Sequence, residues 1–178
     1  EAHKRGIEVI MDLVANDTSN EHPWFRTAGN PHSKYHDWYT WAKPDSDLKA
    51  ISATGGFAWH ALPDGQVDSS QHYLGVFTDE MPDLNYDDPV VRKEMIDVGK
   101  FWLKKGVDGF RLDAAQHVYL DFETDWNSQS VLKKNLDWWR EFHRGIDAVD
   151  PHAWVVGEVW QQYPDQLAPW MDALDATL

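Results

Sequence analysis

The 178-residue chain contains no cysteine, which excludes disulfide scaffolds, cysteine–zinc sites and thiol nucleophiles. It also lacks any apolar run near the roughly 18 residues that a membrane span needs, so we expect no membrane insertion. Basic residues are scarce, because 16 Lys and Arg stand against 30 Asp and Glu and the net charge is −14. Nucleic acid and anionic lipid repel such a polyanion, so neither is an expected partner. The compartment stays open, with a secreted or periplasmic protein as the expectation.

Aromatic residues and aspartate are abundant instead. The chain has 11 Trp, 6 Tyr and 7 Phe, and 22 of its 30 acidic residues are Asp. Flat aromatic faces and short carboxylates suit a surface that stacks on sugar rings and hydrogen-bonds to them. A tryptophan-rich core beneath solvated aspartates explains the same composition. The chain starts at Glu1 with neither Met nor a signal-peptide pattern and stops at Leu178 without a closing element, so we expect a segment of a longer protein.

Three short apolar runs rich in branched residues predict buried parallel strands, at residues 7–14, 107–113 and 153–159. Strands that alternate with helical patterns indicate an α/β fold with a parallel sheet. The first two strands are much farther apart along the chain than the last two. Residues 17–87 therefore form an insertion, expected to be a small, irregular lobe with a few short strands. The predicted domains are residues 1–16 with 88–178, and the inserted residues 17–87.

Two helices are predicted between these strands. Asp88-Pro89 supplies an N-cap and a first-turn proline, and Gly106 occupies the place of a C-terminal glycine cap. After Ser128, apolar residues recur close to every 3.6 positions until the Asp-Pro pair at 150–151. The predicted apolar faces are Val91, Met95, Val98 and Trp102 in the first helix, and Val131, Leu132, Leu136, Trp139, Phe142 and Ile146 in the second.

Acidic residues stand near the C-terminal ends of all three strands: Asp12, Asp113 and Glu158. Functional groups of parallel βα folds gather at these ends, and neighbouring strands lie about 4.8 Å apart. Two such carboxylates can therefore reach the roughly 5–5.5 Å separation that a retaining glycosidase needs. Arg111 lies two residues before Asp113, on the same side of the strand, and is expected to hold Asp113 ionised. The apolar stretch around Glu158 is expected to raise its pKa and suit a general acid.

Four short segments of the chain match known sequence motifs in their order and spacing. They are Asp12-Leu13-Val14-Ala15-Asn16, Met81-Pro82-Asp83-Leu84-Asn85, Gly109-Phe110-Arg111-Leu112-Asp113-Ala114-Ala115-Gln116-His117 and Gly157-Glu158-Val159-Trp160. The first, third and fourth resemble three of the four sequence regions of the α-amylase superfamily, glycoside hydrolase family thirteen. The second resembles the family's fifth region, near the end of its inserted domain. The resemblance runs through nearly the whole chain.

The resemblance implies a partial TIM (β/α)8 barrel, with about strands three to five and their helices, and with domain B inserted after strand three. It implies that the remainder of the barrel, including a third catalytic acid, is missing from this chain. The implied reaction is a retaining double displacement on α-glucosidic bonds. By position, Asp113 would be the nucleophile, Glu158 the acid/base, and Arg111 the partner that orients and charges Asp113.

Substrate contacts and a metal ion are implied in the same way. Asp12 would shape the floor of the site, and His117 would contact the sugar next to the cleaved bond. Gln116, Val159 and Trp160 adjoin these residues and are further candidate substrate contacts. The side chain of Asn16 and the backbone carbonyl of His117 match calcium ligands of many family members, and oxygen donors suit Ca2+.

The chain departs from the family pattern at two of these positions. Asp17 stands where the family usually has His, which contacts the hydroxymethyl group of the bound glucose. A carboxylate can still accept from that hydroxyl, but it adds negative charge near the transition-state cation. Gln116 replaces a common Lys, which weakens the case for a subsite beyond the cleavage point.

The resulting hypothesis is a hydrolase of starch-like α-glucans or maltooligosaccharides. The residue types at two motif positions, Ala114 and Met81, are similar to those of family members with α-1,4 rather than α-1,6 specificity. Two alternatives stay open: a trehalose synthase-like glucosyl transferase that uses the same residues, and a non-catalytic homologue. The nine histidines lack metal-site spacing, so no zinc site is expected. Two interpretations of the aromatic run at residues 36–41 stay open: packing in the core, or a platform on which a sugar stacks.

Overall fold

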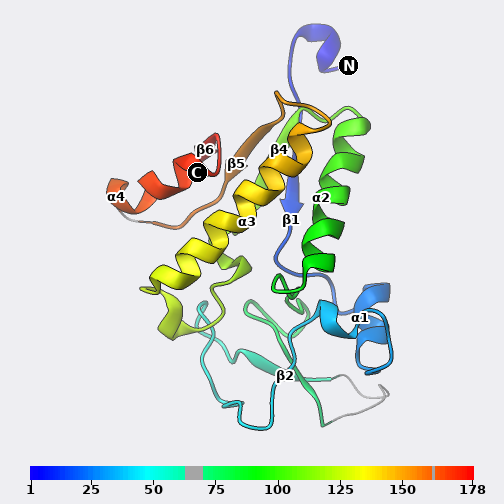
Figure 1. The fold of residues 1–178 in the computed structure, drawn as a ribbon, viewed down its shortest axis with the longest axis vertical. Helices are drawn as coiled ribbons and strands as arrows, with labels where there is room; N and C mark the ends of the chain where they lie inside the picture. Colours follow the sequence, from blue (N-terminus) through cyan, green and yellow to red (C-terminus); the bar gives the residue numbers. More distant parts are fainter. Residues whose placement is uncertain (63–69, 162) are drawn as a thin grey trace.

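The computed structural model describes residues 1–62, 70–161 and 163–178. The main sheet has four parallel strands in the order β1-β4-β5-β6, with bounds β1 (Ile10–Val14), β4 (Gly109–Asp113), β5 (Trp154–Gly157) and β6 (Ala176–Thr177). The register pairs Val14 with Asp113 and Leu112 with Gly157, so the C-terminal ends of β1, β4 and β5 meet at one edge (Figure 1). The predicted α/β layout with a parallel sheet is confirmed.

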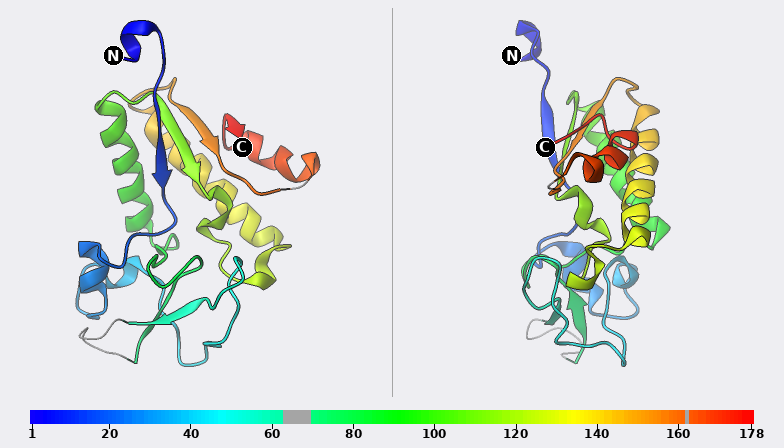
Figure 2. Two further views of the ribbon diagram at one scale, coloured as in Figure 1. Left: turned by 180° about the vertical axis from the view of Figure 1, so that it is seen from behind. Right: turned by 90° about the vertical axis from the view of Figure 1, so that its left-hand side faces the viewer.

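Two long helices cover one face of this sheet, α2 (Pro89–Lys104) and α3 (Gln129–Asp147) (Figure 2). Both begin where the sequence predicts. The Asp88 carboxylate accepts from the backbone N–H of Val90 at 2.8 Å, and the Ser128 hydroxyl caps α3. Gly106 follows α2 with φ +97°, in the left-handed region that its predicted capping role requires. Among the described residues, no helix has the length and apolar content needed to cross a membrane.

The helices approach closely because small residues lie between them. A Cβ on Gly145 would stand 2.6 Å from a methyl carbon of Ile96, so α3 can contact α2 there only without a side chain. The core between the helices and the sheet is wholly buried at Phe110, Trp139, Phe142, Ile146 and Val155. The predicted face of α2 is wrong at Trp102, which is 38% exposed, whereas the adjacent Leu103 is buried.

The first strand is shorter and less buried than predicted. It begins at Ile10 rather than at residue 7, and both Ile10 and Val14 are exposed. The reason is its place at the edge of the described sheet, where only β4 pairs with it. The two-residue strand β6, paired in parallel with β5, was not predicted at all.

Residues between β1 and α2 form a small lobe beyond the C-terminal ends of β1 and β4 (Figure 1). It contains the helix α1 (Pro23–Ala28) and an antiparallel pair, β2 (Trp59–Ala61) with β3 (His72–Leu74). Its core is aromatic, with the rings of Phe25 and Tyr73 edge to face at 4.7 Å. The described residues also contain the short helix α4 (Pro164–Leu167) and five 3-10 turns: His3–Arg5, His36–Trp38, Ala115–Val118, Glu123–Asp125 and Ala168–Asp172. The short strands expected of the insertion are present, and its boundaries at 17 and 87 stay a prediction.

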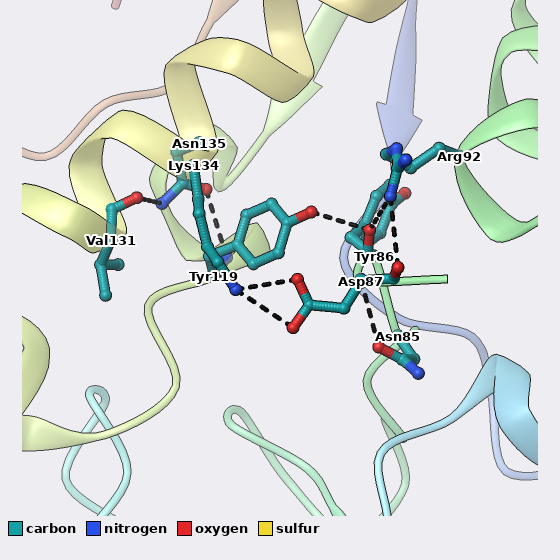
Figure 3. Close-up of polar contacts among 8 residues, drawn as sticks. All are labelled: Asn85, Tyr86, Asp87, Arg92, Tyr119, Val131, Lys134 and Asn135. Atoms are coloured by element: carbon teal, nitrogen blue, oxygen red, sulfur yellow. Dashed lines mark hydrogen bonds and ion pairs between the residues drawn. The ribbon is translucent and has the colours of Figure 1, made fainter. Parts of the chain in front are cut away.

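Polar contacts join the end of this lobe to both helices (Figure 3). The Lys134 ammonium on α3 lies 2.8 and 3.1 Å from the two carboxylate oxygens of Asp87. The carbonyl of Tyr86 accepts from Arg92 on α2 at 2.6 Å and from the hydroxyl of Tyr119 at 2.8 Å. Residues 86–87 are therefore fixed against α2, α3 and the segment that follows β4.

Candidate active site

One guanidinium gathers the acidic residues at the strand ends. Asp12 and Arg111 are direct partners across β1 and β4, and Asp113 lies on the same side of β4 as Arg111. Arg111 Nη1 donates to Asp113 Oδ1 at 2.6 Å and to Asp12 Oδ1 at 3.1 Å, while Nη2 lies 2.9 Å from Glu158 Oε2. The hydrogen bond to Asp113 is the largest cause that raises the pKa of Arg111. The structure thus brings Asp12, Asp113 and Glu158 together, as the sequence predicts.

Backbone geometry holds Glu158 opposite the end of β4. The N–H of Glu158 donates to the carbonyl of Leu112 at 2.9 Å, and its own carbonyl accepts from Ala115 at 2.9 Å. The N–H of Ala114 donates to Glu158 Oε2 at 3.1 Å. Ala114 has φ +43°, in the left-handed region, which costs a residue with a Cβ about 1–2 kcal/mol. This backbone donor was missed as a site group, because no side-chain pattern reveals it.

The expected elevation of the Glu158 pKa is wrong for this structure. Burial is the largest contribution and does raise the pKa of Glu158, as its apolar neighbours suggested. Hydrogen bonds from Ala114 and the Trp160 side chain, together with Arg111, outweigh burial and lower the pKa below its ordinary value. The sequence shows the apolar neighbours but not these three donors, which the fold brings together.

Asp17 lies beside Asp113, at the start of the lobe. Burial, followed by the charge of Asp113, raises the pKa of Asp17 to about 6, although a hydrogen bond from Asn16 opposes the shift. The backbone of Asp17 also forms an antiparallel bridge with Asp83. The expected extra carboxyl near the nucleophile is therefore present, held partly out of water.

The His117 side chain lies inside a cluster of aromatic rings. Phe77, Trp126 and Trp160 contact its ring at centroid distances of 5.3, 5.8 and 5.3 Å, each close to edge to face. His117 is 1% exposed, and this burial lowers its pKa. The ring is therefore buried in this arrangement, and its expected contact with a sugar stays a prediction. Phe77 and Trp126 were missed, because no sequence signal links such distant positions to His117.

The other candidate substrate contacts differ in the solvent exposure of their side chains. Trp160 is 49% exposed beside Glu158 and is available to a substrate. Val159 is 3% exposed and packs in the core, and its predicted substrate contact stays untested. Gln116 is also buried, and its amide oxygen accepts weakly from Gln161 at 3.4 Å.

The side chain of the expected calcium ligand Asn16 lies against Asp83. The buried Asn16 donates its amide to Asp83 Oδ1 at 3.1 Å, and Asp83 Oδ2 accepts from the N–H of Val76 at 2.9 Å. Burial raises the pKa of Asp83 well above its usual range, which favours its neutral form. Across residues 1–62, 70–161 and 163–178, no three His, Cys, Asp or Glu side chains gather closely enough to hold a metal. The expected ligands, the Asn16 side chain and the backbone carbonyl of His117, are not groups of this kind, so calcium binding stays a prediction and no step is assigned to it.

The geometry at Arg111 suits acid–base and nucleophilic chemistry together. Two carboxylates, those of Asp113 and Glu158, face each other across neighbouring nitrogens of one guanidinium. Asp113 is aligned by an ion pair. Glu158 accepts from the N–H of Ala114, which favours its ionised form, whereas burial favours its protonated form. Such a pair can attack a carbon on one side of a bond and exchange a proton with the atom on the other.

Comparisons with known proteins agree on one family. The model of the alpha amylase catalytic domain matches residues 1–178. The chain is 41% identical over 162 residues to "Alpha-amylase 3" of Dictyoglomus thermophilum, which covers 89% of this chain and 28% of that protein. It is 35% identical over 173 residues to "Trehalose synthase/amylase TreS" of Mycolicibacterium smegmatis, 94% of this chain and 28% of that protein.

A solved structure shows the same fold. The alpha-amylase from H.orenii superimposes with a TM-score of 0.80 at 43% identity, over 99% of this chain and 33% of the other. The expected partial barrel agrees with this likeness. The chain spans about a third or less of the length of each of these three relatives.

Proposed function

The chain belongs to the alpha amylase catalytic-domain family, and from that premise we propose that its site cleaves α-glucosidic bonds by a retaining double displacement. The observation that carries the proposal is the meeting of Asp113 and Glu158 at Arg111. Many acidic side chains can lie near the edge of a parallel sheet. Asp113 and Glu158 differ because they share one guanidinium, which orients their carboxylates toward each other.

Each carboxyl has one role in each half of the reaction. Asp113 attacks the anomeric carbon while Glu158 gives its proton to the leaving oxygen, so the glycosidic bond breaks and a glycosyl ester on Asp113 forms. Glu158 then takes a proton from a water molecule that attacks the same carbon and releases Asp113. Arg111 holds the attacking oxygen in place through the 2.6 Å contact.

Glu158 must carry a proton at the first step, although its pKa is lowered in the free site. A sugar bound against Trp160 would cover the carboxyl and remove water from it. Burial already raises the pKa of Glu158 more than any single contact lowers it. Further desolvation by substrate therefore shifts Glu158 toward its protonated form at the moment when it acts as an acid.

We propose an α-1,4-linked glucan or maltooligosaccharide as the substrate. Asp17 lies next to Asp113 with a pKa of about 6. In its ionised form it can accept a hydrogen bond from a sugar hydroxyl, and in its protonated form it can donate one. The positions of Ala114 and Met81 in the family motifs support the α-1,4 over the α-1,6 linkage.

The decisive test is Asp113→Asn in the full-length protein. Hydrolysis of maltooligosaccharides should fall by several orders of magnitude, because the covalent route depends on this carboxylate. Asp97→Asn, on the outer face of α2 and paired with Lys93, is the matched control and should retain full activity. Activity of Asp113→Asn within tenfold of the parent enzyme would eliminate the mechanism.

A second function is favoured by the likeness to the protein named "Trehalose synthase/amylase TreS". In that alternative a sugar hydroxyl, not water, attacks the glycosyl ester on Asp113, and the same residues serve. Product analysis on maltose and on starch separates the two. Rearranged maltose without free glucose would assign the transferase, and starch hydrolysis would assign the hydrolase.

A further inference from the structure

A trough lies between the lobe and residues 118–122, which follow β4, and none of the proposed catalytic residues lines it. It consists of two adjoining hollows of about 380 and 430 Å3. They share Thr40, Trp41 and Lys43 as a common wall. Each hollow falls within the roughly 300–1,000 Å3 typical of sites for small molecules, so the pair can hold more than one sugar unit.

Aromatic rings line this trough in fixed orientations. The Trp41 indole N–H donates to the carbonyl of His36 at 2.8 Å, and its ring is stacked on that of His36 at 5.0 Å. Trp59 on β2 lies in the second hollow beside Phe122, with ring centroids 6.0 Å apart. The rings of His36 and Phe25 lie parallel to that of Trp41 and cover part of it. The half-exposed indole of Trp59 is therefore the main apolar surface for the C–H face of a sugar, at little entropic cost. Within residues 36–41, Trp41 lines both hollows, whereas Trp38 and Tyr39 are buried in the core.

Polar groups complete the lining. A tight turn in which Lys43 N–H donates to Ser46 Oγ at 2.9 Å forms one rim, and Asp47 stands beside it. Asp37 and Asp87 line the other hollow. Carboxylates outnumber the single ammonium, so an anionic ligand is repelled, whereas a neutral ligand with many hydroxyls finds both donors and acceptors.

We propose that this trough is an accessory binding site for a neutral α-glucan chain, a proposal that rests on the function proposed above. A glucan polymer is long enough to occupy the trough and to be cleaved elsewhere on the same enzyme. Holding the polymer at a second point raises its effective concentration at the catalytic residues. The trough should therefore matter for polymers and not for substrates of two or three sugars.

The test measures binding apart from cleavage. The full-length protein carrying Asp113→Asn is run through native gels that contain glycogen, and its retardation gives an apparent affinity. Adding Trp59→Ala should weaken that affinity about five- to tenfold, because an aromatic stacking surface is lost. Adding Lys43→Ala should weaken it about threefold. Trp102→Ala, an exposed tryptophan on α2, is the matched control and should change nothing.

A second readout guards against unfolding. In the active enzyme, Trp59→Ala and Lys43→Ala should turn over a chromogenic maltoside within twofold of the parent rate. Retardation of Trp59→Ala equal to that of Trp102→Ala would overturn the proposal, and so would a parallel loss of maltoside turnover. Unchanged retardation together with thermal stabilisation by millimolar Ca2+ would assign the hollow to a cation instead. Failure of Asp113→Asn to abolish cleavage would refute the catalytic proposal alone, because glycogen retardation is measured independently.

Discussion

Asp121, in the segment that follows β4 and the 3-10 turn Ala115–Val118, is a carboxyl whose ionisation the fold disfavours. Burial, followed by the charges of Asp125 and Asp87, raises the pKa of Asp121 from 3.8 to about 7, and Lys134 opposes the shift only in part. Among the residues that the structure describes, no cation lies within 4 Å of its carboxylate. The folded state therefore binds a proton that the unfolded chain releases near pH 4. The free energy of unfolding should fall as the pH rises from about 4 to about 7.

The size of this effect follows from the shift. About three pKa units at 1.36 kcal/mol each set a ceiling of about 4 kcal/mol, and water entry with local relaxation reduces it to about 2 kcal/mol. Asp121→Asn removes the ionisation, so the variant should be more stable than the parent by about 2 kcal/mol above pH 7. At pH 4 the two proteins should have nearly equal stability.

Thermal unfolding of the full-length protein between pH 4 and pH 8 tests the reasoning. The melting temperature of Asp121→Asn should exceed that of the parent by a few degrees at pH 7.5 and by less than one degree at pH 4.5. Asp97→Asn is the control, because a hydrogen bond from Lys93 lowers the pKa of Asp97 and no such gain is expected. A difference that is the same at both pH values would refute the electrostatic explanation.

Three further predictions follow from packing and charge. Gly109→Ala should prevent folding or lower the free energy of unfolding by several kcal/mol, because its Cβ would lie 2.0 Å from the Trp154 carbonyl oxygen. The control Gly56→Ala has open space around its Cβ, so denaturant unfolding should show no change in stability. Arg111→Lys should lower kcat/KM roughly a hundredfold, since one ammonium cannot replace a fork that serves three carboxylates; a loss below threefold would contradict the role given to the guanidinium. The isolated 178-residue segment should associate and lack starch hydrolysis, because β1 leaves an exposed sheet edge; a monomeric, active segment would disprove this in sedimentation and activity assays.

Local signals predicted the elements of this chain well. Asp88 and Ser128 cap helices as expected, because a cap depends on residues within one turn of itself. Gly106 ends α2 for the same reason. The alternation of strands and helices indicated a parallel sheet, since a parallel pair needs a crossover that the intervening helix supplies.

Errors appeared where a residue's surroundings come from distant parts of the chain. Hydrophobic periodicity shows which face of an element is apolar but not what covers it. It therefore placed Trp102 inside, and it made the edge strand β1 too long and too buried.

The sequence by itself determined that carboxyl groups would stand at the ends of parallel strands, with Arg111 on the side of Asp113, because side-chain direction along a strand has a period of two. Only the tertiary structure decided the pKa values of these groups and their accessibility to a ligand. The pKa of Glu158 depends on N–H groups and a guanidinium that the fold brings from other strands, and the access to His117 depends on three rings from separate loops. Electrostatic fields and burial are sums over neighbours in space, and the order of residues along a chain does not contain those sums.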